Sequence, residues 1–166
     1  MTDNFIKLNK SDVLTLGIKT PDGKDTGEFL QFDLEDIELP LKYQELLEED
    51  KKNKGHLKNQ MLIIERRQDV KGKKLLSKNN EDKIRALNDF FRKEVEIYNI
   101  FLGERGVEKL LNGRKLGWTT LQEIDELIEK QILPHLDISM TKITDKVKAK
   151  YGQAIKRNKE VLEIDE

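Results

Sequence analysis

Side chains able to make or break bonds are scarce in this sequence. His56 and His135 are the two histidines, and each follows a glycine or a proline near a predicted helix end. A solvated or capping histidine is therefore favoured over a catalytic one. The serines Ser11, Ser77 and Ser139 have no histidine at a spacing that indicates a nucleophilic pair. Because the chain also lacks cysteine, disulfides and thiolate metal ligands are excluded. We expect no catalytic residue and no cofactor.

An acidic run before Pro40 is the best candidate for a metal site. Asp33, Glu35, Asp36 and Glu38 offer the hard oxygen atoms that Ca²⁺ and Mg²⁺ prefer. The Asp-x-Asp-x-Asp-Gly pattern of a calcium loop is missing, however. A solvated run that offsets the dipole of the following helix is favoured, so the sequence predicts no metal site.

Residues 51–74 are rich in lysine and arginine, which raises the question of nucleic acid. The stretch has no aromatic residue to stack a base, and acidic residues precede it. An ionic helix face is favoured over phosphate binding. A helix-turn-helix drawn over residues 104–124 would present acidic side chains to phosphates. With 31 Lys and Arg against 32 Asp and Glu, no long-range field collects polyanions. Nucleic-acid binding is therefore disfavoured.

The elements that would position any site are mostly helices. Residues 80–102 carry one apolar stripe, with Asn79 or Asn80 as the cap and Gly103 as the end. Its members are Ile84, Leu87, Phe91, Val95, Tyr98 and Leu102. We expect Phe91, Tyr98 and Leu102 to be buried together with another stripe, formed by Leu121, Ile124 and Ile128.

Shorter patterns complete the predicted fold. Strands at residues 13–19 and 28–33 flank a loop with one proline and two glycines, which predicts a β-hairpin. Pro40 begins a helix, a second helix runs from residue 55 to about residue 70, and a short one occupies residues 104–111. Thr119 or Thr120 then caps a helix that Pro134 should bend or end.

The predicted class is α+β, mainly α. We expect a β-hairpin region at residues 1–38, a helical bundle at 39–136 and a charged C-terminal helix or tail at 137–166. A chain of 166 residues, with 36% apolar and 38% charged residues, supports one modest core. No apolar run is long enough for a membrane span or a signal peptide, so a soluble intracellular protein is the default expectation.

Five residues are candidates for partner binding. Trp118 precedes a predicted helix, where a staple folded back onto that helix is favoured and an exposed anchor is the alternative. The others are Ile143, Val147, Tyr151 and Ile155, which follow one another at four-residue intervals. This stripe is too thin for a core, so we expect it to become ordered when a partner covers it.

The order of these parts resembles a known family. The hairpin, the acidic run into Pro40 and the phrase I-Y-N-I-F-L-G-E-R-G-V-E-K-L-L-N-G at residues 97–113 are similar to tail assembly chaperones of long-tailed (siphovirus-type) bacteriophages of Gram-positive hosts. The resemblance covers residues 31–136. It implies a non-enzymatic protein of the host cytoplasm that binds the tape-measure protein, keeps it soluble, helps recruit major tail protein subunits and is absent from the mature virion.

Other functions stay open at this point. In the family a ribosomal frameshift commonly adds a second domain, which a protein sequence does not reveal. A small DNA-associated regulator and a structural connector of a phage particle are the alternatives. Self-association is compatible with the same patterns.

Overall fold

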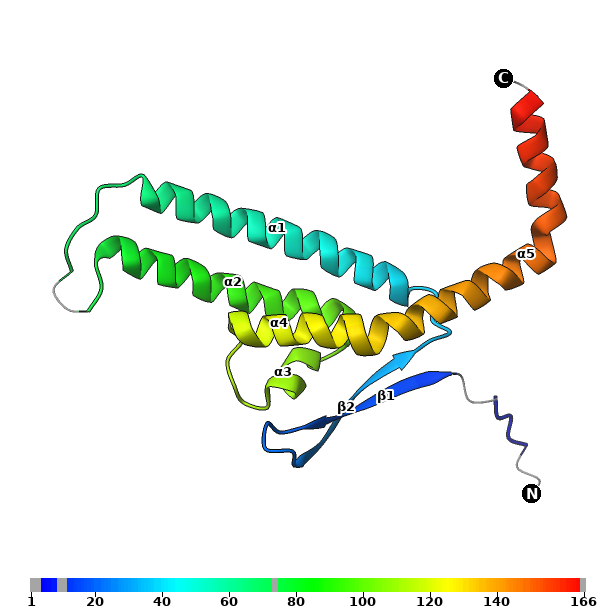
Figure 1. Ribbon diagram of the computed structural model, residues 1–166. Coiled ribbons are helices and arrows are strands. Elements are labelled where there is room, and N and C mark those ends of the chain that lie inside the picture. Colours follow the sequence, from blue (N-terminus) through cyan, green and yellow to red (C-terminus); the bar gives the residue numbers. More distant parts are fainter. Residues whose placement is uncertain (1–3, 9–11, 73–74, 165–166) are drawn as a thin grey trace. The chain divides into compact units, whose positions relative to one another are not determined.

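A computed structural model describes residues 4–8, 12–72 and 75–164, without the side chains of residues 155 and 158–164. Strands β1 (Val13–Lys19) and β2 (Asp25–Asp33) precede the helices (Figure 1). The helical elements are α1 (Leu39–Glu65), α2 (Lys78–Leu102), α3 (Gly106–Leu111), α4 (Trp118–Leu127), the π-helical turn η1 (Ile128–Ile132) and α5 (Leu133–Ile164). The α+β, mainly α, prediction is confirmed. The chain divides into two compact units, and the boundary between them lies between Glu123 and Ile124.

The hairpin of the first unit is antiparallel, with Val13 opposite Asp33 and Leu16 opposite Leu30. Strand β2 begins at Asp25, earlier than predicted, because an irregularity after Gly17 lets the strand pair on past Gly27. A two-stranded sheet is marginal alone. Here the Phe32 ring lies 5.5 Å from the ring of Phe101 at the end of α2, so the sheet rests on the helices as expected.

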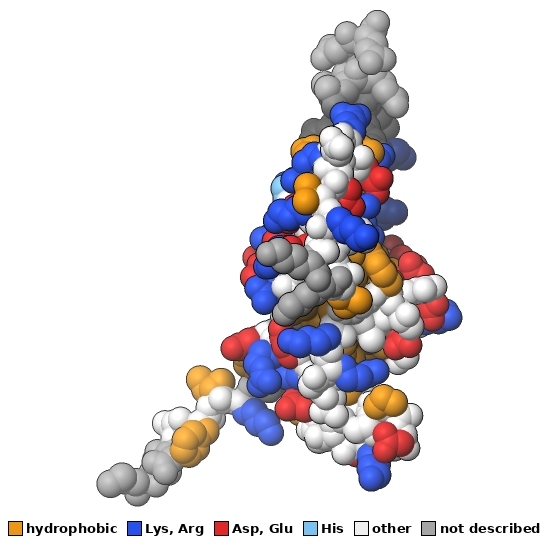
Figure 2. Space-filling view, turned by 90° about the vertical axis from the view of Figure 1, so that its left-hand side faces the viewer, with side chains coloured by type: hydrophobic (Ala, Val, Ile, Leu, Met, Phe, Trp, Pro, Cys, Tyr) orange, Lys and Arg blue, Asp and Glu red, His pale blue; other side chains and the backbone are white. Residues whose placement is uncertain are grey.

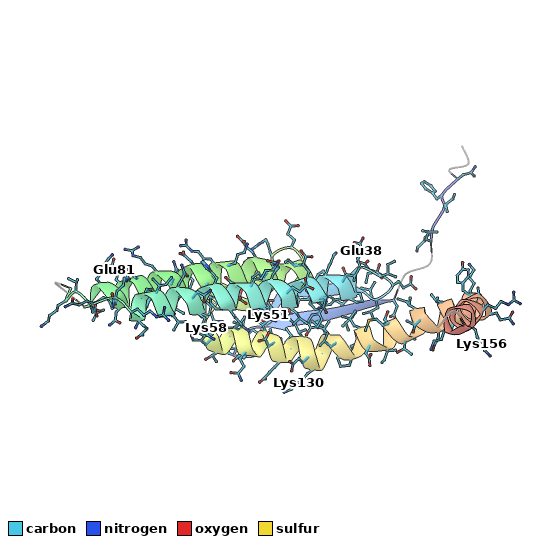
Figure 3. All side chains as sticks on the ribbon, turned by 90° about the horizontal axis from the view of Figure 1, so that it is seen from above. Glu38, Lys51, Lys58, Glu81, Lys130 and Lys156 are labelled. Carbon is cyan, nitrogen blue, oxygen red and sulfur yellow. The ribbon has the colours of Figure 1, made fainter. Side chains whose placement is uncertain are left out.

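Helices α1 and α2 form an antiparallel pair. Glu38, just before α1, and Glu81, at the start of α2, lie at opposite ends of the pair in Figure 3. Pro40 lies in the first turn of α1, as predicted. The prediction of two helices between residues 40 and 70 was wrong, because α1 runs without a break through Gly55. One glycine lowers helix propensity by only about 1 kcal/mol, which packing against α2 outweighs.

The connection between α1 and α2 is fixed by side chains at the start of α2. Ser77, rather than either predicted asparagine, caps α2 by accepting a hydrogen bond from the Asn80 amide at 3.2 Å. Asn79 is buried and instead donates to the carbonyl oxygens of Ile64 (3.1 Å) and Arg67 (3.2 Å). Asn79 therefore caps the end of α1, where the Ile64 carbonyl also accepts from the Arg67 amide at 3.1 Å.

The buried face of α2 differs from the predicted stripe. Ile84 is 51% exposed and Phe91 is half-buried, whereas Tyr98 and Leu102 are buried as expected. The contact face with α1 is rotated toward another set: Asn79, Ala86, Phe90, Glu94, Ile97 and Phe101. Glu94 interrupts the apolar spacing of this set, so a prediction based on apolar periodicity alone did not identify the set.

The break after α2 is organised by Asn99. Its Oδ1 accepts a hydrogen bond from the Val107 amide at 2.8 Å, and its Nδ2 lies 3.1 Å from the Glu108 carboxylate. The Asn99 side chain thus caps α3. The predicted short helix is confirmed, and it ends at Asn112, whose φ of 47° is left-handed. Asparagine tolerates that conformation better than other residues with a Cβ.

Helix α4 begins at Trp118, before the threonines that were predicted to cap it. Thr120 Oγ1 accepts a hydrogen bond from the Gly117 amide at 2.8 Å, so a threonine does close this turn, from within the helix. Leu121 is buried, as predicted.

The second unit begins inside α4 and continues through η1 into α5. Leu133 donates to the carbonyl of Ile128, the five-residue spacing of a π turn. Pro134 follows and has no amide hydrogen, yet the helix continues as α5. Pro134 therefore does not end the helix, and the distortion takes the form of the π turn next to it.

The π turn also explains the isoleucine pattern. The buried residues of the second unit lie at four-residue intervals: Ile124, Ile128, Ile132 and Leu136. In a regular α-helix each such step rotates the stripe by about 40°. A turn that holds an extra residue offsets part of this rotation and keeps the stripe on one side. The predicted packing of Ile124 and Ile128 with Tyr98 and Leu102 concerns both units and stays a prediction.

Candidate partner-binding surfaces

An apolar stripe continues along α5 past its buried beginning. Met140 is 40%, Val147 44% and Tyr151 53% exposed, and Ile143 is half-buried. Positions 140, 143, 147 and 151 repeat at steps of three and four residues, so they share one helix face. The structure brings the predicted residues Ile143, Val147 and Tyr151 onto this face. The fourth predicted member, Ile155, lies outside the residues whose side chains are described.

Basic side chains border this face, which we call the α5 stripe. At 100° per residue, Lys146 and Lys150 lie along one side of it and Lys148 along the other. Lys150 Nζ is 5.6 Å from the centre of the Tyr151 ring, an arrangement in which the cation is attracted to the ring face. The acidic residue within this stretch, Asp145, lies on the opposite side. The α5 stripe is therefore apolar with a positive rim.

Trp118 does not form the predicted staple. Its ring centroid lies 5.3 Å from that of Phe90 and 4.9 Å from that of Phe91, both on α2. The side chain is nevertheless 54% exposed. Trp118 thus covers the α2 aromatics with one face and leaves the rest to solvent. Its role as an anchor for a partner stays a prediction.

Several basic residues of α1 and of the connection from α1 to α2 have acidic partners. Lys54 bonds Asp50 at 2.8 Å, and Asp82 accepts from both Arg67 (2.8 Å) and Lys78 (3.2 Å). These two cations hold the pKa of the Asp82 carboxyl below its usual value, with the Arg67 hydrogen bond as the largest cause. Figure 2, which looks onto this end of the molecule, shows the two charge signs intermingled.

The acidic run before Pro40 also has a local role. Asp33 Oδ1 accepts from the Glu35 amide at 3.0 Å, and Asp36 Oδ1 accepts from the Glu38 amide at 2.9 Å. These carboxylates close consecutive turns that lead into α1. Over the described part of the chain, no three His, Asp or Glu side chains are grouped so as to hold a metal ion.

Comparison of the chain with protein-family models, curated proteins and solved structures found no match. Within the described helices, no stretch combines the length and apolar character needed to cross a bilayer.

A buried polar network between α1 and α2 was not predicted. The Glu94 side chain is fully buried, and its Oε1 accepts from Asn53 Nδ2 at 2.8 Å. The same Asn53 group lies 3.1 Å from the carbonyl oxygen of Phe90. Glu94 Oε2 and Asp50 Oδ1 are buried without a hydrogen-bond partner. Asp50 Oδ2 is bonded to Lys54.

The protonation of Glu94 is strongly perturbed. Burial and then the neighbouring Asp50 carboxyl raise its pKa to about 8, against smaller opposing effects of Asn53 and Lys54. The network could have been suspected from spacing, since Glu94 stands between Phe90 and Ile97 in a run of apolar residues at steps of four and three. An acidic residue at one of these regularly spaced positions indicates a carboxyl group that is buried with the apolar face, in either its ionised or its protonated form.

A cleft of about 380 Å³ opens beside this network. Asn53 and Phe90 line it together with His56, which is exposed and is one of the two histidines predicted to be solvated or to cap a helix. Its remaining lining is mostly long charged or amide side chains: Glu49, Lys52, Leu57, Gln60, Asp89 and Lys93. No nucleophile with a base beside it is found among these residues.

Proposed function

We propose that this chain is a non-enzymatic tail assembly chaperone of a long-tailed bacteriophage. It binds the tape-measure protein and keeps that long helical rod soluble while major tail protein subunits are recruited. The proposal implies work in the host cytoplasm and absence from the mature virion. The observation that carries it is the α5 stripe, an ordered helix face whose apolar side chains Val147 and Tyr151 are about half exposed.

The geometry of the α5 stripe suits an amphipathic helix as the client. Apolar residues at steps of three and four form a row against which the i, i+3, i+4 and i+7 residues of a second helix pack. Exposed apolar rows of this kind are costly to leave in water and commonly mark binding surfaces.

The lysines beside the α5 stripe favour a client whose binding surface is negatively charged. Lys146, Lys148 and Lys150 border the apolar row, so the favoured partner carries Asp or Glu beside its own apolar residues. Two copies of α5 would place lysine against lysine. This repulsion favours a different protein over self-association through α5.

Co-expression with the tape-measure protein of the same phage tests the proposal. A Val147→Ser/Tyr151→Ser variant should lose co-purification of the client about tenfold or more, since loss of about 1.4 kcal/mol of apolar contact suffices for that factor. Ile138→Ser is the matched control. Ile138 is 57% exposed on the same helix but lies on the side opposite the stripe.

The outcomes separate the proposal from its alternatives. Equal client solubility with and without the chain would overturn the chaperone function. Equal loss of client with Ile138→Ser and with the stripe variant would exclude the α5 stripe as the site. Binding to duplex DNA that weakens steeply with salt would favour a DNA-associated regulator. Detection of the chain in purified phage particles would favour a structural connector.

A further inference from the structure

Two carboxyl oxygens stand out among the buried polar atoms of the α1–α2 pair. Glu94 Oε2 and Asp50 Oδ1 both lack a hydrogen-bond partner, whereas the second oxygen of each group is bonded, to Asn53 and to Lys54. The two groups come from different helices, and the Asp50 carboxyl lies close enough to Glu94 to raise the pKa of Glu94. A contact between two carboxyls requires a proton, because two bare carboxylates only repel each other.

We propose that Glu94 and Asp50 share one proton across the α1–α2 interface, and that this proton acts as a latch whose loss at alkaline pH loosens the helix pair. The position of Lys54 indicates which of the two carboxyls carries the proton. Its ammonium group is paired with Asp50 Oδ2 at 2.8 Å, so Glu94 is the group that donates, from Oε2 to Asp50 Oδ1. This bond satisfies both orphan oxygens at once.

Every charged or titratable group that the geometry places against Glu94 fits this arrangement. From α1 these are Asp50 and Lys54, with the neutral Asn53 amide between them. On α2 itself, Tyr98 is buried one turn further along. Lys54 pairs with Asp50, so ionisation of both carboxyls would place two negative charges beside one lysine in the interface.

The latch also fixes the position of the helices along each other. Asn53 binds both the Phe90 carbonyl and Glu94 Oε1, and Asp50 lies one turn before Asn53 on α1. A slip of α1 by one turn would break the Asn53 bonds to Glu94 Oε1 and to the Phe90 carbonyl. Buried polar contacts are best known for selecting register in this way.

The direction of the pH effect follows from the raised pKa of Glu94. In the unfolded chain a glutamic acid releases its proton near pH 4.3, whereas in the folded chain Glu94 holds it until about pH 8. Between these values the folded state binds one proton more than the unfolded state, so stability falls as pH rises. Below about pH 4.3 this group has no further effect. Above about pH 8 its contribution is fully lost.

Urea unfolding between pH 5 and pH 9, followed by circular dichroism, tests the proposal. The unfolding constant of the natural chain, relative to that of Glu94→Gln, should rise about tenfold per pH unit up to pH 8 and then level off. Glu96→Gln is the control, because Glu96 is a solvent-exposed carboxylate of the same helix. This variant should keep the slope of the natural chain.

A ratio between the natural chain and Glu94→Gln that does not change with pH would overturn the latch. If Glu94→Gln does not fold, carboxyl ¹³C NMR of the natural chain gives a direct reading. A Glu94 carboxyl that is still protonated at pH 6.5 supports the shared proton, and one that is already ionised overturns it. Asp50→Asn should move the Glu94 titration toward lower pH, because it removes the neighbouring negative charge.

Discussion

Replacing Phe90 or its neighbour Phe91 with alanine should have very different effects on stability. Phe90 is 3% exposed and belongs to the face of α2 that packs on α1. Emptying such a site costs about 3–5 kcal/mol, which includes the cavity left behind. Phe91 is only half-buried, so its loss removes part of one transfer term and opens no closed cavity, and about 1–2 kcal/mol is expected.

Urea denaturation of both variants provides the measurement. Trp118 is the single tryptophan, and its ring contacts both phenylalanines, so its fluorescence reports on this site while circular dichroism reports on the helices. The two probes should give the same midpoint if the first unit unfolds as one cooperative body. An equal loss of stability in the two variants, or a larger loss for Phe91→Ala, would refute the assignment of the buried face of α2.

Two glycines give opposite predictions. Gly55→Ala should stabilise the chain by roughly 0.5–1 kcal/mol, because Gly55 is inside α1 and a Cβ there meets open space; an unchanged or lower urea midpoint would contradict the continuous helix. Gly106→Ala should destabilise by about 1–3 kcal/mol, because the new Cβ would lie 2.6 Å from the Cβ of Leu102; a thermal midpoint equal to that of the natural chain would mean that the α2–α3 corner is looser than described.

Much of the fold could be predicted because its signals are local. Turn residues and β-prone runs located the hairpin, and Gly103, Asn112 and Gly113 marked helix ends by the backbone conformations that they allow. The boundary errors have a common origin. Ser77, Asn79 and their partners form hydrogen bonds across the α1–α2 connection, and such tertiary contacts leave no periodic trace in the sequence.

The buried network was missed for a related reason. A search for apolar periodicity treats a glutamate as a surface residue. The helix face that contains Glu94 was therefore passed over, and the face with Ile84 and Phe91 was predicted to be buried. The free-energy cost of burying that carboxyl is lowered by its neighbours on the facing helix, which are Asp50, Asn53 and Lys54. Part of the candidate site could be predicted from the sequence, because the spacing of Ile143, Val147 and Tyr151 indicates one helix face. The exposure of Trp118 could not be predicted.

The π turn at Ile128–Ile132 has an evolutionary consequence. A single-turn π-helix is equivalent to one residue inserted into an α-helix, so deletion of one codon in this segment would restore regular hydrogen bonding. Because the π turn absorbs that extra residue, the residues downstream would keep nearly the same direction around the helix axis relative to Ile124. One residue deleted from a regular part of α5 before Val147 would instead turn Val147 and Tyr151 by about 100° relative to Ile124. The π turn is therefore the place in this helix where the length of the chain can change by one residue while the α5 stripe keeps its direction.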